Sequence, residues 1–465
     1  MRPRTLLRAL VFSCVCLSAA SAQPFEREDW VVSIEPTAPD HWGVNHWGLT
    51  NFDLPYRALQ RGKHHLETKY ADNWRFGSES GGLRGIALRS VSSVVDMALF
   101  MGPQNFDHQM GHDARARELS RDFPGSYRYV SRSFSHVLPV YFGGKELDSQ
   151  TNAVTNGRGG ADMNTLTNST LWEMHSQFAY AAGKRILAAD AANATQLENL
   201  LLHRLNMLQT DWKEPDQACV AAHVGSGNGA PFSCRGGSGS AEDYSNYLMD
   251  LNSGRYGIAN VSDYRLKVAD LKRANRLGFL DPVTLVAAYR YGADYIGRGD
   301  NRSRIPMLPV PGTPLRYLPG LRVMLSPFGI EYFQDNYLRW RGTLVNVYWT
   351  RGDNRFERRL GAGVDVDGIP LGRGVTAGVW GTVHKQPLVN RITDTTSLSA
   401  AEVGVLHNTT HFGTSLRVPL REFGDPAAPK QVLLTLKAGR KNDGWLPGEY
   451  IRGSTYVETG LGIRL

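Results

Sequence analysis

A period-two alternation of apolar and polar residues runs through residues 313–465 and constrains the fold more than any other feature. Two of the clearest stretches carry apolar side chains at Val375, Ala377, Val379 and Val383 and at Val432, Leu434, Leu436 and Ala438. Successive side chains of a strand point to opposite faces of a sheet, so this pattern predicts strands with one apolar and one polar face. The segment contains eight or nine such stretches, including likely strands near residues 329–333 and 355–365 and one at 401–405.

A sheet of this length can close on itself or pack as a sandwich. Eight strands of about 10 residues with their turns need about this much chain to form a small membrane barrel. The polar face carries Gly, Arg, Lys, Thr and Glu, which suits a water-filled interior, and the apolar face suits contact with lipid. A soluble β-domain also alternates, so it stays open as the alternative.

The last strand adds a more specific signal. Val457, Leu461, Ile463 and Leu465 share one face, and the sequence stops on that apolar residue. This resembles the C-terminal strand of bacterial outer-membrane β-barrel proteins, which the barrel-assembly machinery reads; those chains usually end on Phe, whereas this one ends on Leu465. Over residues 313–465 the resemblance implies an antiparallel transmembrane β-barrel of about eight strands, surrounded by outer-membrane lipid.

The first 22 residues have the pattern of a secretory signal peptide. Arg2, Arg4 and Arg8 precede an apolar stretch at 10–17, and Ala20-Ser21-Ala22 has the small residues of a cleavage site. The apolar stretch is too short to span a bilayer, and no other stretch approaches 18 uninterrupted apolar residues. We therefore expect an exported chain that has no helical membrane span.

Export also bears on the cysteines and the charge. Cys219 and Cys234 remain after signal removal, and an oxidising compartment favours a disulfide between them across the Gly-rich loop 225–240, with zinc ligation as the alternative. The formal charge of +8 falls to +5 without the three signal arginines. No basic-aromatic cluster accompanies this charge, so we expect no nucleic-acid partner.

Together these patterns predict an α+β protein with a helical N-terminal domain and a C-terminal barrel. Residues 23–80 are irregular apart from a short strand at 30–34, and residues 81–304 are mostly helical. Helices are expected at 83–99, at about 103–121, at about 169–189, from Thr195 onward, at 242–252, at 262–277, and after Asp281-Pro282, where Asp caps the first turn. Four prolines make 305–314 a linker, and 315–465 forms the β-domain.

One helical segment carries a possible metal-binding pattern, Asp107-His108-Gln109-Met110-Gly111-His112-Asp113. His108 and His112 are four residues apart, so their rings share one helix face and can converge on one cation. Over about ten residues this resembles the His-Glu-x-x-His helix of zincin metallopeptidases, which implies that His108 and His112 bind Zn²⁺. The zincin general base is a Glu after the first His; here that position is Gln109, so the base must come from elsewhere.

The segment Leu171-Trp172-Glu173-Met174-His175 offers the missing groups. In the predicted site His175 completes the zinc ligands with His108 and His112, and Glu173 activates the bound water; alternatively Glu173 is the third ligand. Zinc would lower the pKa of that water and polarise a carbonyl of a peptide or lipid substrate.

The expected function is that of an outer-membrane protein whose helical domain, in the periplasm or at the membrane interface, is a zinc-dependent hydrolase of the peptidase kind. Two other functions stay open. The barrel could anchor a non-enzymatic binding or assembly module, as the missing glutamate favours, or the protein could be a lipid-modifying enzyme of the surrounding leaflet.

Overall fold

The computed structural model describes part of the chain. It covers residues 29–34, helical positions between 60 and 67, residues 82–99, positions between 187 and 202, residues 260–300, and residues 302–464 with gaps, of which the longest is 388–405. The predicted signal peptide and the predicted disulfide between Cys219 and Cys234 lie outside the described residues.

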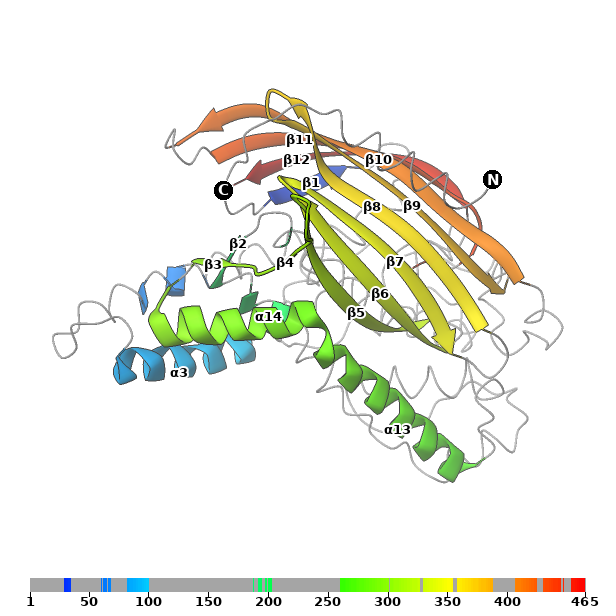
Figure 1. The fold of residues 1–465 in the computed structure, drawn as a ribbon, viewed down its shortest axis with the longest axis horizontal. Helices are drawn as coiled ribbons and strands as arrows, with labels where there is room; N and C mark the ends of the chain where they lie inside the picture. The colour runs from blue at the N-terminus through cyan, green and yellow to red at the C-terminus, as the bar shows by residue number, and fades with distance from the viewer. Residues whose placement is uncertain are drawn as a thin grey trace, which may run out of the picture.

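An antiparallel sheet dominates the described part of the molecule (Figure 1). Its ten described strands follow the order β1-β12-β11-β10-β9-β8-β7-β6-β5-β4. Their bounds are β1 Asp29–Ile34, β4 Leu308–Pro309, β5 Arg316–Ser326, β6 Gly329–Trp340, β7 Thr343–Asp353, β8 Arg358–Gly372, β9 Val375–Pro387, β10 Leu406–Phe423, β11 Lys430–Lys441 and β12 Ser454–Arg464. The sheet curls, so that β5 to β8 lie in front of β10 to β12 in Figure 1.

The alternation predicted most of these strands correctly. The expected stretches of this segment fall in the strands β5 to β12 wherever the structure describes them; 401–405 and the start of 355–365 lie outside the described residues. The short strand expected at 30–34 is β1, and it pairs with β12 from Asp29↔Arg464 to Ile34↔Thr459. The sequence pattern did not predict this pairing, because it joins opposite ends of the chain.

The two faces of the sheet have opposite polarity, with the polar face inside. Buried polar side chains line the inner face; they include Asp335, Asn346, Thr350, His384, Gln386, Thr409, His411 and Gln431. Large apolar side chains are exposed on the outer face; they include Val347, Trp349, Leu360, Val379, Val383, Phe412, Leu420, Val457 and Leu461. This is the reverse of a water-soluble sheet, which buries its apolar face.

The inner polar groups bond to one another across the strands. Arg322 donates to both carboxylate oxygens of Asp335 at 2.6 and 2.8 Å, and Asn346 Nδ2 donates to the same carboxylate at 2.8 Å. On the opposite wall, Lys437 Nζ lies 3.2 Å from Glu458 Oε1. These charge-assisted bonds compensate the cost of burying the polar groups.

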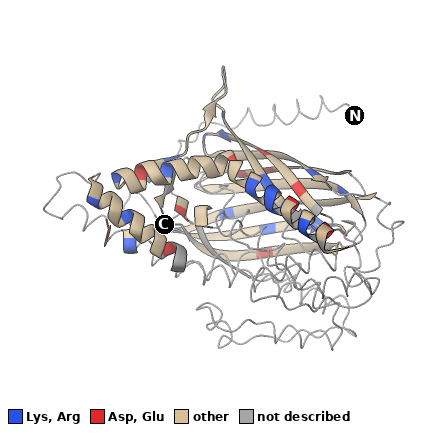
Figure 2. Ribbon diagram, turned by 90° about the horizontal axis from the view of Figure 1, so that it is seen from below, with Lys and Arg blue, Asp and Glu red and all other residues tan. Residues whose placement is uncertain are grey.

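The described helices lie at one end and one edge of the sheet. They are α3 (Leu83–Leu99), α13 (Val261–Leu277), the short 3₁₀ turn η5 (Gly278–Leu280), α14 (Pro282–Arg290) and the π-helix η6 (Tyr291–Gly297). Figure 2 shows α3 beside the α14–η6 helix, and several Lys and Arg positions, in blue, along α13. None of the helices that the structure describes is both long and apolar enough to cross a membrane.

Asp281 connects the helices to the sheet. As predicted, it caps α14: its Oδ1 accepts from Val283 N at 3.3 Å, and its Oδ2 accepts from Thr284 Oγ1 at 3.0 Å. The same Oδ1 also accepts from Leu321 N on β5 at 3.0 Å. One buried carboxylate therefore caps a helix and binds the outer edge of β5.

An apolar core consolidates this junction. It joins α14 and η6 to the first part of β5 and to the β6–β7 hairpin; its members include Leu187, Leu197, Leu200, Val283, Ala287, Tyr291, Tyr295, Ile305, Met307, Leu318, Tyr337 and Leu344. Burial of Leu197 and Leu200 agrees with the helix that was expected to begin near Thr195. Arg339, on β6, donates to the carbonyl of Leu187 at 3.2 Å.

The proline-rich segment 305–314 differs from its predicted role in one respect. Its prolines were expected to exclude sheet, yet Leu308 and Pro309 form β4 and pair with Tyr317 and Arg316. Pro309 is tolerated because β4 is an edge strand, where a missing N–H breaks no ladder on its outer side.

We predict that Asp281→Ala weakens the link between helices and sheet. Loss of the cap should cost about 1 kcal/mol, and leaving the Leu321 N–H without its acceptor should add about 1–3 kcal/mol. Denaturant unfolding of the protein in detergent measures the change. Asp281→Asn, which keeps an acceptor oxygen, is the control and should lose less; equal unfolding midpoints for Asp281→Ala and the unmodified protein would contradict this role.

Candidate functional site

The helix α3 buries its polar face. Arg89 and Asp96 are almost fully buried, whereas Leu83, Val91 and Val94 on its apolar face are more than half exposed. An amphipathic helix usually buries the apolar stripe. This inversion shows that the polar stripe of α3 meets other polar groups inside the protein.

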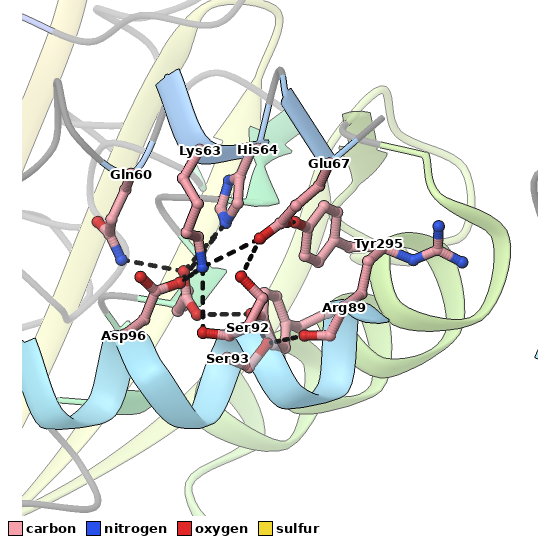
Figure 3. Close-up of polar contacts among 11 residues, drawn as sticks. Gln60, Lys63, His64, Glu67, Arg89, Ser92, Ser93, Asp96 and Tyr295 are labelled. Atoms are coloured by element: carbon pink, nitrogen blue, oxygen red, sulfur yellow. Dashed lines mark hydrogen bonds and ion pairs between the residues drawn. The ribbon is translucent and has the colours of Figure 1, made fainter. Parts of the chain in front are cut away.

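A second polar stripe, from residues 60–67, meets it. Gln60, Lys63, His64 and Glu67 are spaced at i, i+3, i+4 and i+7, so they share one helix face, and this segment is helical at its described positions rather than irregular. Figure 3 shows this face pointing toward Ser92, Ser93 and Asp96 of α3. The two stripes, together with Glu198, Tyr291 and Tyr295, form what we call the buried polar cluster.

At the centre of the cluster, three potential metal ligands converge from three segments. His64, Asp96 and Glu198 are 1–2% exposed, and one ligand atom of each lies within 4.8 Å of the other two. His64 Nε2 is 3.2 Å from Glu198 Oε2 and 3.9 Å from Asp96 Oδ2. An imidazole with two carboxylates is a donor set that suits zinc and similar divalent metals.

Neighbouring side chains hold Glu198 in place. Gln60 Nε2 donates to its Oε2 at 2.9 Å, and the Tyr291 hydroxyl donates to its Oε1 at 2.7 Å. The Tyr291 hydroxyl is also 2.7 Å from Ser93 Oγ on α3. Both oxygens of this carboxylate are therefore oriented by bonds from different elements.

Glu67 is held in a similar way at the other side of the cluster. It accepts hydrogen bonds from Ser92 and from Tyr295, and Lys63 Nζ lies 3.4 Å from its Oε1. Lys63 also forms an ion pair with Asp96 and donates to the carbonyl of Ser92 at 3.2 Å. Tyr295 further packs on His64, with ring centroids 4.6 Å apart.

Negative side chains outnumber positive ones in the described part of the cluster. Its carboxylates are Glu67, Asp96 and Glu198, whereas its permanent cations are Lys63 and Arg89. With the carboxylates ionised, these five described side chains carry a net charge of 2 − 3 = −1, before His64 or a bound cation is counted. An excess of this sign favours the binding of a cation.

The π-helical turn η6 supplies both tyrosines of the cluster. Burial raises the pKa of Tyr291 far above its usual value of 10, and the charge of Glu198 raises it further. Burial also raises the pKa of Tyr295, with the hydrogen bond to Glu67 as the next cause. Both hydroxyls therefore stay protonated and act as donors to the carboxylates.

The residues of the predicted zinc site, His108, His112, His175 and Glu173, all lie outside the described residues. The hydrolase site therefore stays a prediction.

Sequence reasoning missed the buried polar cluster. The sequence pattern places His64 in the irregular segment 23–80, where a ligand is conceivable but a polar loop residue is favoured, and Asp96 on the polar face of the helix 83–99; it gives no role to Glu198. The signal that could have found the cluster is the shared spacing of the two stripes, because polar residues at i, i+3, i+4 and i+7 recur in both 60–67 and 89–96. Glu198 carries no comparable signal, because it sits among leucines.

No protein-family model, curated protein or solved structure matches this chain. Its function must therefore be inferred from the geometry alone.

We predict that the tyrosines destabilise the protein at alkaline pH. A pKa that is raised on folding contributes stability that is complete below pH 10, the ordinary tyrosine value, and is lost as the pH rises above it. Thermal unfolding followed between pH 8 and pH 12 should show a loss of stability above pH 10 that is smaller in Tyr291→Phe and Tyr295→Phe. An identical alkaline loss in all three proteins would refute this assignment.

Proposed function

We propose that this chain is an outer-membrane protein whose curled sheet crosses the bilayer and whose helical part lies on the periplasmic side. The observation that carries the proposal is the reversed polarity of the sheet: polar side chains inside, apolar side chains outside. In water, an outer face of this kind would leave large apolar side chains such as Trp349, Phe412 and Leu461 solvated, at about 25 cal/mol per Å² of apolar surface. Lipid removes that cost.

The lengths of the strands support insertion. From β5 to β12, every strand has between 11 and 18 residues. A tilted strand needs about 9–11 residues to cross the hydrocarbon core, whereas strands of soluble proteins are commonly about 5–6 residues long.

The connections support the orientation. At one end of the sheet, Arg341-Gly342 joins β6 to β7 and Arg373-Gly374 joins β8 to β9; at the other end, residues 388–405 and 442–453 make the longest connections. Outer-membrane barrels have short turns on the periplasmic side and long loops outside. The apolar core that carries α14 lies at the short-turn end, beside the β6–β7 hairpin, which corresponds to the periplasm.

The backbone groups at the edge of the sheet need partners in lipid, because an unpaired backbone group in hydrocarbon costs several kcal/mol. No ladder joins β1 to β5 among the described strands. In our proposal, β4 and the start of α14 cover the β5 edge, where Asp281 already accepts the N–H of Leu321. The helical part therefore completes the membrane-embedded sheet as well as extending from it.

For the helical part we propose a zinc-dependent hydrolase site formed by His108, His112 and His175, with Glu173 activating water. Its support is the spacing of the two histidines in the sequence and the nearby Glu-x-His pair. A periplasmic position next to lipid would give it access to peptides or to lipids of the inner leaflet.

We predict that an arginine on the outer face impairs insertion, whereas one on the inner face does not. Leu434 and Thr435 are neighbours on β11 and lie at the same depth, but point to opposite faces. Leu434→Arg should cost up to about 2–4 kcal/mol near the bilayer midplane. The measurement is the amount of folded, heat-modifiable protein in outer-membrane fractions.

Thr435→Arg is the matched control and should insert normally, losing only the hydrogen bond from Thr435 to Gly460. A soluble sheet would give the reverse result: Leu434→Arg would fold normally, whereas Thr435→Arg would yield less folded protein. That result, or recovery of the unmodified protein from the soluble fraction without detergent, would overturn the proposal.

A separate experiment tests the hydrolase site. The double variant His108→Ala/His112→Ala should lose zinc, as measured by elemental analysis, together with any hydrolysis of peptide or lipid ester substrates. Equal zinc content in the double variant and the unmodified protein would rule the site out, without bearing on membrane insertion.

A further inference from the structure

We propose that His64, Asp96 and Glu198 bind one divalent metal ion of the zinc class, as a structural centre that joins three segments of the helical part. The proposed ligands differ from those of the hydrolase site proposed at His108 and His112. This centre rests on the described geometry and would stand if that hydrolase site failed.

The ligand spacing fits a tetrahedral ion. Nitrogen and oxygen ligands bound to zinc at about 2.0–2.2 Å stand about 3.3–3.5 Å apart in a tetrahedron. His64 Nε2 lies 3.2 Å from Glu198 Oε2 and 3.9 Å from Asp96 Oδ2, so the observed separations bracket this value. All three ligand atoms lie within 4.8 Å of one another, so the side chains must draw together to close around an ion.

Gln60 provides an independent indication. This side chain is 1% exposed, and its Oε1 makes no hydrogen bond among the described residues, although its Nε2 donates to Glu198. A buried amide oxygen without a partner is costly. A half-turn of the amide exchanges its oxygen and nitrogen, which have nearly the same shape. With an ion bound, the oxygen can then complete the ligand set beside Glu198, in place of the hydrogen bond from Nε2.

The charge balance of the cluster and the surroundings of the three ligands also favour a bound metal ion. Once Lys63 turns to solvent, the three carboxylates and Arg89 carry −3 + 1 = −2, which a divalent ion balances. His64 then stays neutral, the form in which imidazole binds metals. The hydrogen bond from Tyr291 to Glu198 Oε1 then acts as an orienting contact to a ligand carboxylate. All three ligands are buried, and structural zinc sites are closed in the same way, whereas catalytic ones keep an open position.

Lys63 is the competitor for this position, because its ammonium pairs with Asp96. Its side chain is 21% exposed, whereas that of Asp96 is 1% exposed. Lys63 can therefore turn toward solvent when a cation binds, but Asp96 cannot leave. Removal of the lysine charge should therefore strengthen metal binding.

The test uses the full-length protein in detergent, stripped with a chelator and then titrated with Zn²⁺ against a chromophoric zinc indicator. Glu198→Gln should lower the affinity of this site by at least about 10-fold, since it removes a charged ligand but keeps the shape. Glu67→Gln is the matched control, because it removes the same charge from the same cluster but removes no proposed ligand. It should lose clearly less affinity for zinc than Glu198→Gln.

Lys63→Met gives a second, opposite readout and should raise the affinity. This readout keeps the proposal testable if Glu198→Gln does not fold. The double variant His108→Ala/His112→Ala identifies the site that is being titrated: the buried centre should still bind zinc in it.

Three results would overturn the proposal: no zinc binding that depends on Glu198, equal losses in Glu67→Gln and Glu198→Gln, or weaker binding in Lys63→Met. Loss of all zinc from the His108/His112 double variant alone, with Glu198→Gln unaffected, would support the hydrolase site and reject this one.

Discussion

Hydrogen bonding across the inner face of the sheet is the interaction on which the rest of the structure depends. A sheet that turns polar groups inward must satisfy them there, since each unpaired one costs about 1–3 kcal/mol. The Arg322–Asp335–Asn346 group on β5 to β7 and the Lys437–Glu458 pair on β11 and β12 do this from opposite walls. Because these inner polar side chains have hydrogen-bond partners, the apolar side chains can face outward.

The helical part likewise turns polar side chains inward and apolar side chains outward. α3 presents Asp96 inward against Lys63 and His64 of the 60–67 segment, and Arg89 against the carbonyl of Ile296 on η6. It leaves Val91 and Val94 outside. Buried ionic groups of this kind contribute little net stability but penalise any arrangement that separates them. The cluster therefore specifies how α3, residues 60–67 and η6 meet, whereas the apolar core around Leu197, Ala287 and Tyr337 supplies most of the attraction.

The sequence predicted local structure well and long-range structure poorly. The strands β5 to β12, the helices at 83–99 and 262–277 and the Asp281 cap were predicted because each depends on neighbours within a few residues. The partner of β1, the second role of Asp281 on β5 and the meeting of His64 with Glu198 could not be, because they join residues 40 to more than 400 positions apart. The expectation that prolines exclude sheet was wrong at Pro309 for a related reason: whether a proline is tolerated depends on which side of the strand is paired.

The pairing of β1 with β12 has a consequence for how the molecule is made. β1 precedes the whole helical part, yet its partner is the last strand. A ladder that closes so long a loop forms late, because the chain entropy of closure must be overcome before the contact stabilises anything. Residues 29–34 cannot pair with β12 until synthesis of the chain has reached that last strand. Pairing of β1 is then the last step in forming the sheet, and a chain that lacks β12 cannot complete it.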